Sequence, residues 1–92
     1  MTLLQVVQEL ETFNKEDTIY VAAPWTEHSL SRVLREADSG KIPAEAVSLG
    51  FEYFLEVFIA CEFIQEFEEC LEIIPTIKQK CLRLIEYANN DA

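Results

Sequence analysis

The sequence predicts a small α+β domain with an N-terminal helix, a short three-stranded antiparallel or mixed sheet, and two C-terminal helices on one face of the sheet. Segments with the period of a helix lie near both ends of the chain, and β-branched and aromatic segments lie between them. Half of the 92 residues are hydrophobic, which is enough for a core. We therefore expect residues 1–92 to form a single domain near the lower size limit of independent folding.

The first predicted helix covers residues 2–13. Its apolar residues recur at helical spacing and share one face: Leu3, Val6, Val7, Leu10 and Phe13. Thr2 and Gln5 fit a capping box, in which each side chain satisfies a free backbone N–H. Asn14 and Lys15 end the helix. Residues 18–23 are mostly β-branched or aromatic and too few for a helix, so they predict a strand that Pro24 ends.

Residues 29–37 admit two interpretations. Helical spacing relates four of their apolar residues, namely Leu30, Val33, Leu34 and Ala37. An ion pair between Arg32 and Glu36 would support that helix. The alternative is a strand from Ser31 to Arg35 that pairs with the first strand. Periodicity slightly favours the helix. Residues 38–43 are predicted to form a loop because they contain Gly40 and Pro43.

The central segment is predicted to be a strand over residues 51–57 followed by a helix from Phe58. On the strand, Glu52, Phe54 and Glu56 alternate with Tyr53, Leu55 and Val57. On the helix, one arc is apolar: Ile59, Phe63, Ile64, Phe67, Cys70, Leu71 and Ile74. The opposite arc is polar: Glu62, Gln65, Glu66, Glu68, Glu69 and Glu72. A helix that starts at Phe51 is the competing interpretation.

The last predicted helix covers residues 77–88. Pro75 blocks continuation of the preceding helix, and Thr76 with Gln79 forms a second capping box. The inward side is expected to contain Ile77, Cys81, Leu84, Ile85 and Ala88. The outer side is expected to contain Lys78, Lys80 and Arg83.

Negative charge is concentrated in one part of the sequence. Between Lys41 and Lys78 there are eight glutamates and no lysine or arginine, which accounts for most of the formal net charge of -10. This balance argues against direct binding of nucleic acid and of anionic membranes, because both interactions need basic side chains. It favours attraction to a basic protein. No segment has 18 consecutive apolar residues, so no membrane span is predicted.

Few residues suggest chemistry. His28 is the only histidine, and with Glu27 alone it is a weak signal for catalysis or metal binding. The odd number of cysteines, Cys61, Cys70 and Cys81, favours reduced thiols and a cytoplasmic location. Cys70 and Cys81 fit packed thiols, while carboxylates near Cys61 would raise its pKa. Trp25 is interpreted either as a binding anchor or as the closure of the core. No catalytic or metal-binding motif occurs, so we expect no enzyme activity, cofactor or metal.

Two stretches together resemble a group of small uncharacterised bacterial α+β domains. They are residues 19–26, Ile-Tyr-Val-Ala-Ala-Pro-Trp-Thr, and residues 50–57, Gly-Phe-Glu-Tyr-Phe-Leu-Glu-Val, with the helix that follows. Some members of that group are similar to immunity proteins that neutralise toxins. The resemblance implies that the segment after the tryptophan is a strand, and we adopt the strand there. It implies no catalytic residues.

Charge and resemblance lead to one functional hypothesis. We expect an acidic inhibitor that binds a basic toxin or nuclease, most concretely an immunity protein that covers a basic active site. The expected contact residues are Glu52, Glu56, Glu62, Glu66, Glu69 and Trp25. The alternatives are a counter-defence protein that mimics DNA, a structural or adaptor homodimer, and a small enzyme.

Overall fold

The computed structural model describes residues 1–35 and 42–91. Its centre is an antiparallel sheet in the order β2-β1-β3, formed by β1 (Asp17–Ala22), β2 (Ser31–Arg35) and β3 (Phe51–Glu56). The helices are α1 (Leu3–Gln8), α2 (Ala44–Leu49), α3 (Val57–Glu69) and α4 (Ile77–Asp91), and a 3₁₀ turn, η1 (Leu10–Thr12), follows α1. The α+β class and the antiparallel sheet are confirmed.

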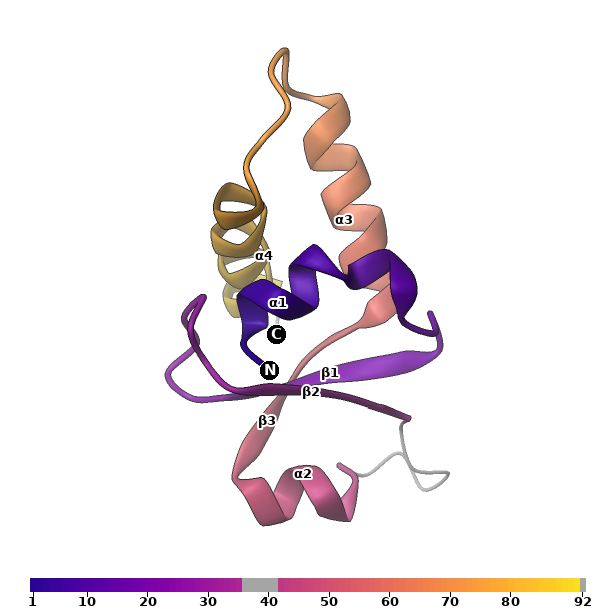
Figure 1. Ribbon diagram of the computed structural model, residues 1–92, viewed down its shortest axis with the longest axis vertical. Coiled ribbons are helices and arrows are strands. Elements are labelled where there is room, and N and C mark those ends of the chain that lie inside the picture. The colour runs from indigo at the N-terminus through magenta and orange to yellow at the C-terminus, as the bar shows by residue number, and fades with distance from the viewer. Residues whose placement is uncertain (36–41, 92) are drawn as a thin grey trace.

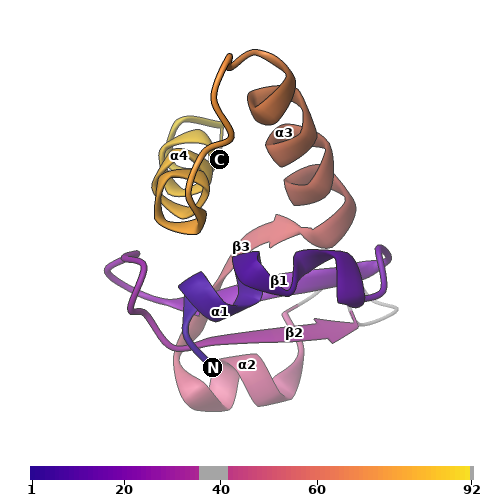
Figure 2. The same ribbon diagram turned by 45° about the horizontal axis from the view of Figure 1, so that its top comes forward.

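Helices lie on both sides of this sheet. α1, α3 and α4 lie on one side and α2 on the other (Figures 1 and 2). In β1, Ile19 and Val21 belong to the core under the three helices. Tyr20 points the other way, is buried, and makes an edge contact with Tyr53, with ring centroids 6.5 Å apart. The central strand is therefore buried on both faces. The prediction lacked α2, whose six residues are too few to show a helical period.

The capping predictions are confirmed at both ends of the chain. The backbone N–H of Thr2 donates to Gln5 Oε1 over 2.8 Å, and the backbone N–H of Gln5 donates to Thr2 Oγ1 over 3.2 Å. The same pair of bonds joins Thr76 and Gln79, at 2.8 and 3.1 Å. The strand from Ser31 to Arg35 is also confirmed, and it pairs with β1. Most of the predicted loop at 38–43 lies outside the described residues.

A bulge in β3 changes which residues reach the core. The pairing of β1 with β3 shifts between Ile19, opposite Leu55, and Tyr20, opposite Tyr53, so Phe54 is an extra residue on β3. Phe54 is 0% exposed and Leu55 is 5% exposed, and both belong to the same core. Simple alternation placed them on opposite faces, which was wrong because alternation assumes an uninterrupted ladder.

The buried side of α3 also differs from the predicted apolar arc. Ile64 is buried as expected, but the other buried residues of the helix are Val57, Ala60 and Cys61. α3 follows β3 directly and packs on β1 and η1 as well as on α4, so its most buried side is centred on these residues, while Ile59 and Phe63 are half-buried and pack at the edge of the core. The helix ends at Glu69, so the predicted positions of Cys70, Leu71 and Ile74 on its inner face were wrong, and all three are exposed.

The last helix agrees with the sequence pattern. Cys81, Leu84, Ile85 and Ala88 of α4 are buried, and Ile77 packs against the same core. α3 and α4 together form a hairpin whose connection, residues 70–76, lies at one end of the molecule's long axis (Figure 1). The molecule measures 42 × 24 × 23 Å, so this hairpin end is far from α2.

Candidate functional site

Three of the predicted contact residues share one side of α3. Glu62, Glu66 and Glu69 follow each other at intervals of four and three residues, opposite the buried side of the helix, and all are exposed. Within residues 1–35 and 42–91, none of the three makes an ion pair. Gln65 Nε2 donates to Glu69 Oε1 over 3.5 Å. We call these three glutamates the acidic face.

The cations of α4 are engaged with other carboxylates. Lys78 Nζ lies 3.6 Å from Glu27 Oε1, and Lys80 Nζ lies 3.5 Å from Glu68 Oε1. Arg83 Nη1 donates to Glu86 Oε1 over 2.7 Å. Of the glutamates on α3, only Glu68 is paired in the part of the chain that the structure describes. The acidic face is therefore not neutralised from within the described chain.

The positions of the glutamates on α3 lower the stability of that helix. Glu66, Glu68 and Glu69 lie in its last turn, which carries no basic residue. Carboxylates at a helix C-terminus face the negative end of the helix dipole, at a cost of about 0.3–1 kcal/mol each when exposed. Glu62 with Glu66 and Glu66 with Glu69 are like-charged neighbours that cost about 0.2–0.5 kcal/mol per pair. Helix stability therefore gives no reason for this placement.

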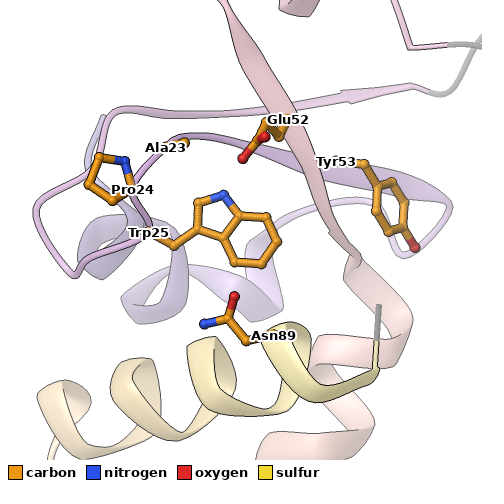
Figure 3. A pocket seen from close by; sticks show the side chains of 6 residues that line it. All are labelled: Ala23, Pro24, Trp25, Glu52, Tyr53 and Asn89. Atoms are coloured by element: carbon orange, nitrogen blue, oxygen red, sulfur yellow. The ribbon is translucent and has the colours of Figure 1, made fainter.

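The other predicted contact residues lie elsewhere. Glu52 and Trp25 line a hollow together with Ala23, Pro24, Tyr53 and Asn89. Figure 3 shows the Trp25 ring in this hollow, between β3 and α4, with Glu52 on one side of it and Asn89 on the other. Glu56 is half-buried at the end of β3. The six predicted residues thus separate into the acidic face, the hollow and Glu56.

Trp25 closes one end of the core. Its ring meets Phe54 edge-on, with centroids 5.0 Å apart, and it packs against the core cluster. Its Nε1 is buried and, among the described residues, has no hydrogen-bond partner. The loop that carries it is fixed by Ser29, whose Oγ donates to the Pro24 carbonyl over 2.8 Å and accepts from the backbone N–H of Thr26 over 2.8 Å.

His28 does not form a metal-binding cluster in the described structure. Its Nε2 lies 3.6 Å from Glu27 Oε1, and the imidazole is exposed. No group of three or more His, Cys, Asp or Glu side chains that could hold a metal ion occurs in the described ranges. In the same ranges, no helix combines the length and the hydrophobicity that a membrane span requires.

The three cysteines occupy different environments. Cys61 and Cys81 are buried, whereas Cys70 is exposed, contrary to the packing expected for it. Burial raises the pKa of the Cys81 thiol to about 11, and Glu27 adds to this. Burial also raises the pKa of Cys61, against the opposing effect of the Lys15 ammonium. The predicted direction for Cys61 is correct, but burial rather than carboxylates is the main cause.

The raised pKa of Cys81 predicts an alkaline loss of stability. Between the ordinary thiol pKa of 9.0 and about 11, the unfolded chain releases a proton that the folded chain keeps, so stability falls as pH rises. The slope from this group is about 1.4 kcal/mol per pH unit. In urea unfolding, the difference in the free energy of unfolding between wild type and Cys81→Ala should decrease by about 1 kcal/mol from pH 8 to pH 10. A constant gap would contradict the assignment.

Sequence reasoning missed an apolar cluster at the end of the hairpin. Leu71, Ile73 and Ile74 are all exposed, although the first and last were assigned to the inner face of a helix. A signal against a helical Ile74 was present in the sequence. The residue before a proline is disfavoured in helical conformation, so Ile74 before Pro75 is an unfavourable helical position.

The chain was compared with protein-family models, curated proteins and solved structures, and none of the three comparisons gave a significant match.

Proposed function

We propose that this protein binds a basic protein through the acidic face of α3 and inhibits it stoichiometrically. The observation that carries the proposal is the exposure of Glu62, Glu66 and Glu69 on one side of one helix, without a cation paired to any of them in the described chain. Their cost to α3 supports a role outside folding. The most concrete form of the proposal is that the protein is an immunity protein that neutralises a toxin.

Electrostatics supplies the mechanism. A row of carboxylates attracts a basic surface over a distance set by the ionic strength, which raises the rate of encounter. On a nuclease-like partner, the same carboxylates would occupy positions that normally hold substrate phosphates, and the bound inhibitor would cover the active site. The rigid helix presents the three charges in a fixed arrangement, which limits the entropy lost on binding.

The salt dependence of association tests this function. The partner is first captured from a lysate of the native host, identified and purified. Its association rate with wild type is then measured by stopped flow at about 50 mM and about 500 mM salt. Electrostatically steered association should slow at least about tenfold over that range, because the Debye screening length falls from about 14 Å to about 4 Å. An unchanged rate would exclude the acidic face as the recognition element.

A further inference from the structure

The connection between α3 and α4 exposes apolar side chains instead of burying them. Ile73 is 80% exposed and Ile74 is 84% exposed, while Leu71 and the α4 residue Leu82 are 43% and 46% exposed. Single exposed leucines are common on protein surfaces, but a contiguous group marks an interaction site. We call Leu71, Ile73, Ile74 and Leu82 the apolar tip.

The apolar tip continues into a groove along the seam between α3 and α4. One hollow is lined by residues 70–75 and Gln79. A second is lined by Phe67, Leu71, Gln79, Leu82 and Arg83. A third is lined by Phe63, Glu66, Phe67, Cys70 and Arg83. The first two hollows share Leu71 and Gln79, and the last two share Phe67 and Arg83, so the three hollows adjoin one another along the seam, and we refer to them together as the groove.

The wall of this groove is held by contacts among aromatic rings. Phe63 stacks on Phe67 with centroids 6.4 Å apart and on Tyr87 with centroids 4.6 Å apart. The Arg83 guanidinium carbon lies 5.7 Å from the centroid of the Phe67 ring, and its charge is paired with Glu86. A wall that is already ordered costs little to order on binding, so a bound segment keeps more of its contact energy.

Charge at the rim decides what kind of occupant fits. Glu66 lines the third hollow and Glu72 lines the first, and Glu69 lies between them in the sequence. A second copy of this chain docked symmetrically at the apolar tip would bring these carboxylates against their own counterparts. An anionic membrane would repel them too. The complementary occupant is an apolar segment with basic residues.

We propose that the apolar tip and its groove bind a segment of the partner protein that combines leucine-like side chains with lysine or arginine. This inference rests on the proposed function for the basic character of the partner, and it adds the site of the apolar contact. The acidic face would then govern the rate of encounter, whereas the apolar tip would govern how long the complex lasts.

A synthetic peptide tests the inference even before the partner is identified. The probe has about 18 residues, with leucines at helical spacing and lysines on the other side. A scrambled peptide of the same composition is the peptide control. Wild type should bind the probe more tightly than the scrambled peptide. Ile73→Ser with Ile74→Ser should weaken that binding at least about tenfold by faster dissociation, with the association rate nearly unchanged.

Matched variants separate the two proposals. Leu30→Ser with Val47→Ser removes two exposed apolar side chains that line none of the three hollows and should bind the probe like wild type. Replacement of all three acidic-face glutamates by glutamine should slow association of the probe and reduce its salt dependence. Far-UV circular dichroism and melting temperature check that each variant is folded.

Each outcome has a distinct meaning. If the isoleucine variant binds like wild type while the glutamine variant associates slowly, the apolar tip is rejected and the proposed function stands. If the isoleucine substitutions speed dissociation of the probe, while neither salt nor the glutamine substitutions change its association rate, the proposed function is rejected and the apolar contact stands. Failure of wild type to prefer the helical probe over the scrambled peptide overturns the inference. A dimer in sedimentation velocity that the isoleucine substitutions abolish overturns it in favour of self-association.

Discussion

Phe54→Ala is expected to lower the free energy of unfolding by about 3–5 kcal/mol, the range for a large aromatic removed from a packed core. Phe54 is fully buried, lies at the bulge of β3, and supports the ring of Trp25. Alanine would leave a cavity that a strand paired to β1 cannot close. Since small domains are stable by only about 5–15 kcal/mol, the variant should lose a large share of its stability.

Urea unfolding followed by tryptophan fluorescence measures this effect directly. Trp25 is the only tryptophan and touches Phe54, so its emission reports on the same region. Phe58→Ala is the matched control, because Phe58 is the same residue type but lies exposed at the start of α3. The control should lose less than about 1 kcal/mol. A similar small loss for Phe54→Ala would contradict its burial and, with it, the bulged register.

Reversal of the acidic face is expected to separate stability from binding. The variant Glu62→Lys, Glu66→Lys and Glu69→Lys places positive charge near the C-terminus of α3, where the helix dipole favours it. The three lysines repel one another as the glutamates did, so the gain comes from the dipole alone, and we expect about 1–2 kcal/mol in the free energy of unfolding. Association with the basic partner should slow at least about 100-fold, because attraction becomes repulsion.

The control for this variant reverses three charges elsewhere. Glu9, Glu16 and Glu45 are exposed and lie outside α3. Their replacement by lysine changes the net charge equally. At physiological salt the screening length is about 8 Å, so the control should associate within about threefold of wild type. Equal loss in both variants would mean that total charge, rather than the acidic face, attracts the partner. Chemical unfolding and stopped-flow association provide the two measurements.

The parts of the fold that followed from sequence are those set by local chemistry. The capping residues Thr2 and Thr76 mark helix starts through hydrogen bonds to residues three positions away, so they can be recognised from a short stretch of sequence. The strand at Ser31–Arg35 is different, because its spacing also fits a helix. Pairing with β1, a long-range interaction, sets its conformation.

The features that sequence did not predict depend on distant contacts. The bulge at Phe54 requires the register of two strands, which local alternation does not contain. The end of α3 at Glu69 exposes Leu71 and Ile74, which a helical wheel had placed inward.

In the candidate site too, residues close in sequence could be grouped in advance, whereas residues far apart could not. Glu62, Glu66 and Glu69 lie on one helix, so their spacing was sufficient to group them. The hollow around Trp25 and Glu52 also includes Asn89, and only folding brings these three together.

The direct succession of β3 and α3 has a mechanical consequence. Glu56 ends the strand and Val57 begins the helix, so no linker separates the sheet from the hairpin. The backbone N–H of Phe58 also donates to the Lys15 carbonyl, which ties the base of α3 to the turn before β1. The base of the hairpin is thus fixed at two points. Any load applied at residues 70–76 is transmitted to the edge strand β3, where it acts on the hydrogen bonds that pair β3 with β1.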